Sequence, residues 1–231
     1  MSLSDFRRRT VRRGLNSIYL KASGGDKRFR ITSPYGIFPE ARELEKDFSK
    51  VKAEVENLIN LSRPRKYGEF DPERAAEVSN DWKIYYAKFM GAINAEAIQL
   101  LPTVTAFAAR TPRVANVVVS VLEPRVNLKA HAGTSGGFVR YHLSLEVPKV
   151  NPPHIRVDQE RYTWKEGESI ILDDTFDHEV YNECDERRIV LIVDIFRPMN
   201  RFLDGINRIH TWSRRRAARE ILAESTVMDR N

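Results

Sequence analysis

The sequence predicts a mainly β protein in which helices precede and follow a core of short strands. Three observations predict this class. Apolar residues recur at helical spacing in the first half, short apolar or alternating runs separated by Gly, Pro, Asn and Asp fill residues 114–196, and the end is again helical. Several short strands at such spacing are typical of a sandwich or a barrel.

The first half is expected to be largely helical. From Pro39 to Leu61 apolar residues recur at steps of three and four, which predicts one amphipathic helix. A short helix capped by Asp71 should follow. Residues 82–90 are rich in aromatics and are expected to form a strand. Residues 95–110 predict a helix disturbed at Pro102 and closed by Pro112.

The second half has the texture of β structure. Residues 114–122 are β-branched and almost uncharged, and residues 138–147 alternate between apolar and polar side chains. Further strands are expected at 154–157, 161–164, 169–172, 178–181 and 189–196, followed by a helical tail over 201–223. No internal repeat is present, so the helices and the strands are expected to form one domain over 1–231.

The composition excludes several classes of protein. The chain has 231 residues, 42% apolar and 30% charged, too apolar for a disordered chain. No uncharged run approaches the roughly 20 residues of a membrane span, and no secretory signal opens the chain. We therefore expect a soluble, cytoplasmic protein. The single cysteine, Cys184, excludes an internal disulfide and any multi-cysteine metal site, and we interpret it as an ordinary thiol.

The net charge of +6 is concentrated at the two ends, because residues 1–30 carry +7, residues 197–231 carry +4 and the middle carries about −5. Arginine clusters lie at 7–9, 12–13 and 214–216. Such ends could bind phosphate, nucleic acid or an acidic lipid surface, or they could be solvated helical termini. We favour the solvated termini and expect no nucleic-acid partner, since no recognition motif is present.

Three histidines and two arginines of the β region form a pattern with chemical meaning. His131 follows one strand, His142 lies on the next with Arg140 on the same face, and His178 begins a later strand. Two histidines from opposite ends of a barrel can hold a divalent metal at its mouth. Arg188, ten residues after His178, would lie on an adjacent antiparallel strand, where it could clamp the distal carboxylate of a dicarboxylate.

This set suggests an iron and 2-oxoglutarate site, in which two histidines and a carboxylate usually bind non-haem iron(II). The usual place of the carboxylate is two residues after the first histidine. Here that residue is Gly133.

Four stretches resemble the aspartyl/asparaginyl β-hydroxylase family: His131–Lys149, Tyr162–Glu168, Leu172–Asn182 and Arg188–Pro198. The resemblance covers roughly residues 80–198. It implies a double-stranded β-helix, also called a jelly roll, with residues 81–198 as the oxygenase core. Residues 1–80 would then be a basic arm and supporting helices, and 199–231 a helical tail. It also implies iron(II), 2-oxoglutarate and dioxygen as cofactor and cosubstrates.

The resemblance also assigns roles to residues. His131 and His178 would be the iron ligands, and Gly133 would mark the absent carboxylate, as in family members that hydroxylate Asp and Asn. Ser120 and Arg188 would hold the distal carboxylate of 2-oxoglutarate. Arg140 and His142 would lie near its metal-binding end.

The substrate is less well defined by the resemblance. Asp174 matches an acidic position near the substrate, but Phe138 replaces a basic residue of the Asp/Asn hydroxylases, and the chain lacks their tetratricopeptide region. We expect hydroxylation of an unactivated C–H bond, at the β-carbon of an aspartyl/asparaginyl-type or other small amino-acid-derived substrate, free or within a peptide. Lipid hydroxylation ranks lower, because lipid-modifying relatives usually keep an acid where Gly133 stands.

Two alternatives stay open. The His131-Ala132-Gly133 triplet leaves room for chloride on the metal, as in halogenases, which would act on a small or phosphorylated substrate. The other is a catalytically silent jelly-roll binding module.

Overall fold

The computed structural model describes residues 3–227, with side chains over residues 13–223. The strands are β1 (Ile31–Thr32), β2 (Arg65–Lys66), β3 (Lys83–Phe89), β4 (Ala92–Ile93), β5 (Val114–Leu122), β6 (Leu128–His131), β7 (Phe138–Glu146), β8 (His154–Val157), β9 (Glu160–Thr163), β10 (Ser169–Leu172), β11 (His178–Tyr181) and β12 (Arg188–Phe196). The α-helices are α1 (Leu3–Ala22), α2 (Ala41–Lys46), α3 (Phe48–Asn60), α4 (Pro72–Val78), α5 (Ala95–Leu100), α6 (Pro102–Arg110), α7 (Arg201–Ser213) and α8 (Arg215–Val227).

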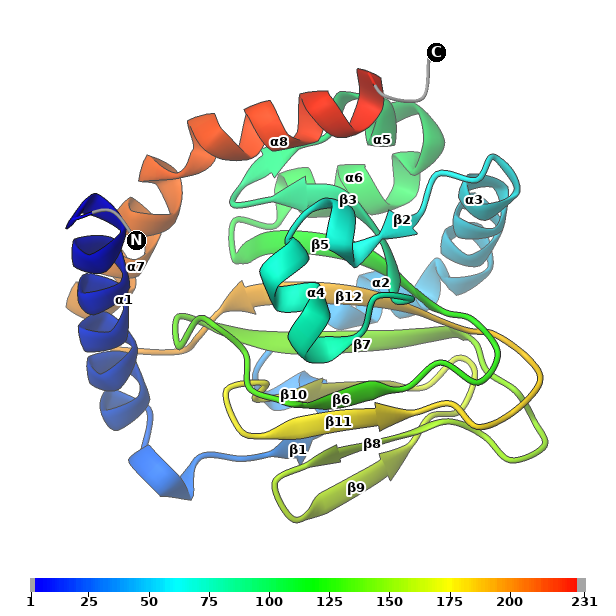
Figure 1. Cartoon of the computed structure of the whole chain (residues 1–231), viewed down its shortest axis with the longest axis horizontal. Helices are drawn as coiled ribbons and strands as arrows, with labels where there is room; N and C mark the ends of the chain where they lie inside the picture. The colour runs from blue at the N-terminus through cyan, green and yellow to red at the C-terminus, as the bar shows by residue number, and fades with distance from the viewer. Residues whose placement is uncertain (1–2, 228–231) are drawn as a thin grey trace.

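The strands form two antiparallel sheets (Figure 1). The larger has the order β1-β10-β7-β12-β5-β3-β2, with β4 paired to β3, and the smaller has the order β6-β11-β8-β9. Consecutive strands alternate between the sheets from β5 to β8 and again from β9 to β12. This alternation makes a jelly roll, and the mainly β fold class predicted from the sequence is confirmed.

The larger sheet is covered on both faces, which explains its uninterrupted apolar strands. Every residue of β5 and β12 is buried. Because side chains alternate along a strand, Val117 and Val119 pack toward α2, α3, α5 and α6, whereas Val118 and Leu122 face the smaller sheet. The molecule therefore has three layers: helices, the larger sheet and the smaller sheet.

Most predicted elements are confirmed, and the main difference lies in one of the predicted helices. Asp71 caps α4 by accepting a hydrogen bond from the Arg74 amide, and Pro102 separates α5 from α6 as expected. The single helix predicted over Pro39–Leu61 is wrong, because the chain breaks at Asp47 into α2 and α3. The break brings Leu44 and Val51 into one core.

The two ends of the chain are helical. The arm expected at the N-terminus contains α1, a helix of 20 residues, and the expected tail is two helices, α7 and α8. Figure 1 shows α1 along one edge of the molecule and α8 across its top. The side chains of the arginines at 7–9 and 12 lie outside the described residues. No helix among the residues described combines the length and the apolar character needed to cross a membrane.

Candidate active site

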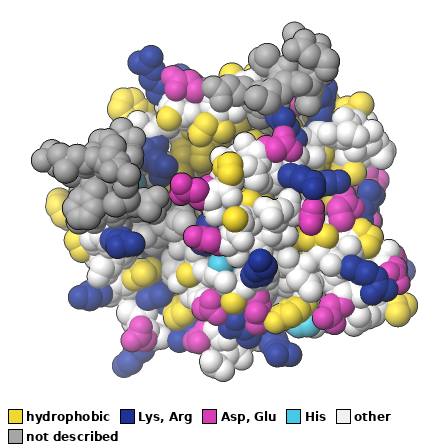
Figure 2. Space-filling model, viewed as in Figure 1, with side chains coloured by type: hydrophobic (Ala, Val, Ile, Leu, Met, Phe, Trp, Pro, Cys, Tyr) yellow, Lys and Arg dark blue, Asp and Glu magenta, His cyan; other side chains and the backbone are white. Residues whose placement is uncertain are grey.

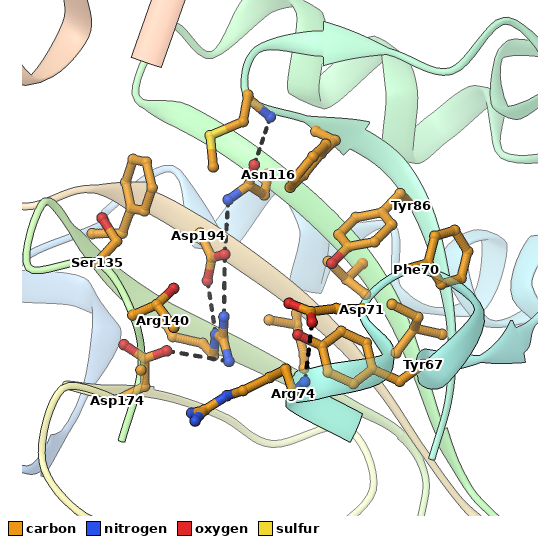
Figure 3. A pocket seen from close by; sticks show the side chains of 18 of the residues that line it. Tyr67, Phe70, Asp71, Arg74, Tyr86, Asn116, Ser135, Arg140, Asp174 and Asp194 are labelled. Carbon is orange, nitrogen blue, oxygen red and sulfur yellow. Dashed lines mark hydrogen bonds and ion pairs between the residues drawn. The ribbon is translucent and has the colours of Figure 1, made fainter. Parts of the chain in front are cut away.

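A cavity of about 360 Å³ opens where the two sheets meet, between α1, α4 and the α7–α8 pair. Figure 2 shows a hollow with apolar side chains on this face of the molecule, and Figure 3 shows the polar side chains inside it. A smaller chamber of about 20 Å³ lies nearby and shares His131, Arg140 and His178 with the cavity. The candidate residues from the sequence gather around these two spaces.

The two expected metal ligands are cross-strand neighbours. His131, the last residue of β6, pairs directly with His178, the first residue of β11, and their ring centroids lie 4.2 Å apart. They therefore meet on adjacent strands of one sheet, rather than reaching each other from opposite ends of a barrel. Nδ1 of each ring lies within hydrogen-bond distance of a backbone oxygen, that of Lys129 at 2.6 Å and that of Phe176 at 3.0 Å.

These contacts leave both Nε2 atoms available. Burial lowers the pKa of both His131 and His178 to about 4, so both rings are neutral at pH 7. Neutral imidazole with its second nitrogen fixed by a carbonyl is the usual form of a metal-binding histidine. Over the described part of the chain, no three His, Cys, Asp or Glu side chains are grouped to hold a metal.

Position 133 requires glycine, because the carboxylate of Asp174 occupies the space that a side chain would need. A Cβ atom built on Gly133 would lie 2.5 Å from Cγ of Asp174, and the Gly133 amide donates to the Asp174 carbonyl oxygen at 2.6 Å. A carboxylate is therefore present beside position 133, but it comes from the β10–β11 loop. Burial raises the pKa of Asp174, and the nearby Arg140 opposes this shift.

A chain of hydrogen bonds crosses the floor of the cavity (Figure 3). Arg140 contacts Asp174 at 3.3 Å and donates to Asp194 at 2.8 Å, and Asp194 accepts a further bond from Asn116 at 2.9 Å. Burial alone would lower the pKa of Arg140, but the two carboxylates outweigh it and raise the pKa. Arg140 is thus fully paired and serves to hold Asp174 in place.

Arg188 lies in the smaller chamber as a buried cation without a carboxylate partner. It is 1% exposed, its Nη1 lies 3.3 Å from Ser120 Oγ, and its guanidinium stands 4.3 Å from the centre of the Trp164 ring. Its Nε atom has no partner, and no ion pair involving it is found in the part of the chain that is described. Burial lowers the pKa of Arg188 to about 9, because nothing offsets the cost of desolvating its charge.

His142 and Ser120 complete this chamber. Both ring nitrogens of His142 are buried without a partner, and burial, with Arg188 next, lowers its pKa well below the usual range. Ser120 also accepts a hydrogen bond from the Trp82 indole at 2.9 Å. The structure therefore brings Ser120, His142 and Arg188 together in one chamber.

The expected position of Arg188 in the sheet is wrong. Its strand, β12, pairs with β5 and β7 of the larger sheet, whereas His178 lies on β11 of the smaller sheet. Arg188 reaches the chamber from across the sandwich. Ser120 is its neighbour because the register pairs Arg188 with Leu122, two residues from Ser120 on the same face of β5.

The chamber fits an anionic ligand. A buried cation and buried polar atoms without partners cost free energy unless a ligand supplies the missing hydrogen bonds. One end of a dicarboxylate would satisfy Arg188 and Ser120, and its other end would extend toward the histidine pair. These residues fit 2-oxoglutarate and a divalent metal.

Aromatic and apolar side chains form part of the remaining cavity wall, beside polar ones such as Asn16, Asp71 and Ser135. Phe138, which begins β7, is buried and packs against Phe196 with ring centroids 5.6 Å apart. Tyr86 lies between two phenylalanines, Phe70 of the loop before α4 and Phe89 of β3. Within the described side chains, Arg74 of α4 is held by Glu77 and by the Ala132 carbonyl oxygen.

Two buried polar groups fix the loops that carry the site. Asp173, which is fully buried, pairs with Arg28 at 2.8 Å and Arg197 at 2.6 Å, and so fixes the start of the loop that leads to Asp174 and His178. Asn207 of α7 donates to the Gly137 carbonyl oxygen at 2.7 Å and holds the loop between His131 and Phe138.

Sequence reasoning missed several residues of the site. Asp194 is the one acid in the apolar run Ile189–Phe196, and a lone acid there implies a buried partner. The sequence alone could therefore have indicated Asp194 as a buried, paired residue. Trp164 is a buried aromatic whose ring faces the Arg188 guanidinium. Nothing in the sequence pattern places Trp82 or Asn116 near the site.

The arrangement is that of a jelly-roll protein with a pair of neighbouring histidines beside a chamber that contains a buried arginine. A model of the family described as aspartyl/asparaginyl beta-hydroxylase matches residues 45–198, two thirds of the chain. The chain therefore belongs to this hydroxylase family, as its sequence motifs indicated.

Two relatives illustrate the range of the family. An ornithine lipid ester-linked acyl 2-hydroxylase of Rhizobium tropici is 33% identical over 165 residues, covering 70% of this chain and 59% of the relative. The human aspartyl/asparaginyl beta-hydroxylase is 27% identical over 163 residues, covering 68% of this chain and 21% of the relative. The chain thus matches just over half the length of the first relative and about a fifth of the second.

Solved structures with some likeness include cupin domains. One from Schizosaccharomyces pombe has 8% identity and a TM-score of 0.35, covering 52% of this chain and 68% of that domain. A cupin barrel protein from Salinispora arenicola has 13% identity and a TM-score of 0.34, covering 57% of this chain and 86% of that protein.

Proposed function

We propose that this chain is an iron(II)- and 2-oxoglutarate-dependent hydroxylase acting on an unactivated C–H bond. The observation that carries the proposal is the unpaired, buried Arg188 in the chamber beside the neutral His131–His178 pair. A cation of this kind is costly to the free protein, and a dicarboxylate that also reaches the histidines would offset that cost.

The proposal gives each site residue a separate role. The Nε2 atoms of His131 and His178 would hold the metal, and Arg188 with Ser120 would hold the distal carboxylate of 2-oxoglutarate. When bound, iron and 2-oxoglutarate would allow dioxygen to act as the oxidant, with 2-oxoglutarate supplying two of the electrons that reduce it. His142 and Arg140 would border the metal-binding end of the cosubstrate, and the apolar wall of the cavity would exclude water from the substrate carbon.

The cavity favours an amphipathic substrate over a purely acidic one. Arg140 is already paired to Asp194 and Asp174, so it offers no free cation to an aspartyl side chain. Phe138 and the aromatic wall suit an apolar segment. We propose an amino-acid-derived substrate with an apolar portion, and the substrates to compare are an acylated ornithine lipid and aspartyl or asparaginyl peptides.

The two alternatives fit the residues less well. Chloride on the metal would have to lie beside Gly133, where the carboxyl group of Asp174 already occupies the space. A silent binding module could also use Arg188 to hold an anion, but it would have no need of the neutral His131–His178 pair beside the chamber.

The test is anaerobic titration with iron(II) and 2-oxoglutarate, followed through the visible charge-transfer band of the complex. We expect a band in the wild type and in His154→Ala, whose imidazole stacks on Tyr181 away from the site. His131→Ala and His178→Ala should lose it. Absence of the band in the wild type would contradict the proposal and favour the silent module.

Chloride and substrate separate the remaining possibilities. The band should not shift on addition of chloride, and succinate formation in air should rise when the true substrate is present. A chloride-dependent shift together with chlorinated product would overturn the hydroxylase proposal in favour of the halogenase.

A further inference from the structure

Helix α7 carries an apolar stripe that is exposed among the residues the structure describes. Phe202, Ile209 and Trp212 are 75%, 69% and 70% exposed. Their spacing of seven and three residues places them on one side of the helix. The opposite side carries the buried Asn207 and Thr211, so the stripe faces away from the cavity.

Basic residues flank the stripe. Residues 201–223 contain six arginines and two acids, a net charge of +4 with His210 neutral. Arg201, at the start of α7, and Arg216, early in α8, are both exposed, and the Arg216 side chain is 93% exposed. The acids are engaged locally, since Asp204 pairs with Arg208 and Glu220 lies 3.4 Å from Arg216.

We propose that the α7–α8 pair is a docking surface for an anionic lipid bilayer. An amphipathic helix with aromatic and aliphatic side chains on one side and arginines beside them inserts its apolar side at the level of the headgroups. Trp212 is the residue type that favours this interface, and the arginines complement acidic lipids. The surface is independent of the chemistry proposed at the histidine pair.

A second copy of the chain fits this surface poorly. A symmetric contact through the stripe would bring the two sets of arginines together, and like charges across an interface are unfavourable. Three side chains also cover far less than the roughly 800 Å² per partner of a stable interface. A bilayer has neither problem, because its surface is negative and of unlimited area.

The docking surface and the cavity share helix α7. Asn207, His210 and Arg214 line the cavity from the side of the helix opposite the stripe. Docking would therefore leave the cavity on the protein side of the helix, with its α7 wall close to the membrane.

The experiment is co-flotation of the full chain with vesicles of phosphatidylglycerol and with vesicles of phosphatidylcholine. We expect binding to the anionic vesicles, weakened by salt, and a blue shift of Trp212 fluorescence. The triple variant Phe202→Ser/Ile209→Ser/Trp212→Ser should lower the partition coefficient by about a hundredfold or more. Arg201→Gln/Arg216→Gln should lower it by about tenfold or more.

Matched variants keep the test specific. Ile98→Ser/Val150→Ser removes two exposed apolar side chains elsewhere, and Arg125→Gln removes an exposed arginine elsewhere. Both should bind as the wild type does. Trp212→Phe should keep binding and lose the fluorescence shift, which covers the case in which the triple variant does not fold.

Three results would overturn the proposal. The wild type could fail to float with anionic vesicles, or the stripe and control variants could bind equally well. The chain could also be a dimer in sedimentation that Trp212→Ser converts to a monomer, which would assign the stripe to a contact between copies.

Discussion

At the scale of single residues, the ligand-binding role proposed for Arg188 should come at a cost in the stability of the ligand-free protein. Replacing it with methionine removes a buried charge that has no carboxylate partner in the described structure and keeps most of the side-chain volume. We expect Arg188→Met to raise the free energy of unfolding of the ligand-free protein by about 1 kcal/mol or more, ~2–4 °C in Tm. Urea and thermal unfolding measure this.

The same variant should lose affinity for 2-oxoglutarate by about tenfold to a hundredfold, since a hydrogen bond to a charged group contributes about 1.5–3 kcal/mol. Arg187→Met is the control. Arg187 is half-exposed and pairs with Glu146 at 2.9 Å, so its loss should leave cosubstrate binding unchanged. A less stable Arg188→Met protein with normal affinity would show that Arg188 serves the core and not a ligand.

Gly133 gives a second prediction. An aspartate placed at this position, where a metal-binding carboxylate usually stands, should not improve the protein. In Gly133→Asp the new Cβ would lie 2.5 Å from Cγ of Asp174, so that carboxylate must move and its contact with Arg140 must break. We expect the variant to be less stable by about 1–3 kcal/mol and to have lower turnover.

Gly133→Asp/Asp174→Gly provides the matching test, because it removes the clash. The two substitutions should compensate in stability, with a coupling of at least about 0.5 kcal/mol in a double-mutant cycle. Additive effects would mean that position 133 tolerates a side chain without moving Asp174.

How far the sequence predicts these residues depends on what each side chain touches. His131, His178 and Arg188 can be selected as candidate site residues from the sequence, because their side chains can bind metals or anions and they lie at the predicted strands. The role of Asp174 beside Gly133 is not, since it arises from a backbone contact between two loops more than forty residues apart. Arg140 was expected to contact the cosubstrate, and the structure shows it held by Asp194 and Asp174.

At the scale of elements, the spacing of apolar residues predicts the strands well, and helix-breaking residues predict the helix ends. Both signals are local properties of the chain. The alternation in β7 and the apolar run of β5 predict those strands to within a residue. Pairing is not local. The pairing of β12 with β5 and β7, and not with β11, depends on the closure of both sheets, so the direction from which Arg188 enters was not predictable.

The contact of α7 with the site loop gives the prediction at this scale. A Cβ on Gly137 would clash with Oδ1 of Asn207. Gly137→Ala should therefore push α7 away, lower stability by about 1–3 kcal/mol and reduce turnover. Gly205→Ala is the control within the same helix. Nothing lies within 4 Å of its Cβ, so it should raise stability by ~0.5–1 kcal/mol. The reverse order of stabilities would contradict the close packing of the loop on α7.

At the scale of the whole molecule, Asp173 ties together three distant segments. Its carboxylate binds Arg28, which follows α1, and Arg197, which directly follows β12, while its own loop carries Asp174 and leads to His178. Burial alone would raise the pKa of Asp173, but the hydrogen bonds from Arg197, Thr175 and Arg28 outweigh it and lower the pKa. The carboxylate is therefore charged at neutral pH, and both arginines depend on it.

The last prediction follows from that dependence. Asp173→Asn should cost about 3–5 kcal/mol, because it leaves two buried guanidinium groups without their carboxylate. Asp158→Asn breaks a pair with Arg30 that is a quarter to a third exposed, and it should cost less than about 1 kcal/mol.

The pH dependence of unfolding tests whether the charge of Asp173 is the source of this stability. Since the folded pKa of Asp173 lies below that of the unfolded chain, its contribution is complete above the unfolded value near 4 and is lost as the pH falls toward the folded pKa. The difference between wild type and Asp173→Asn in urea unfolding should therefore shrink in acid and stay constant from pH 5 to 8. A difference that is small at pH 7 would show that the two arginines find other partners, and that the ends of the chain are not fixed to the active site through this carboxylate.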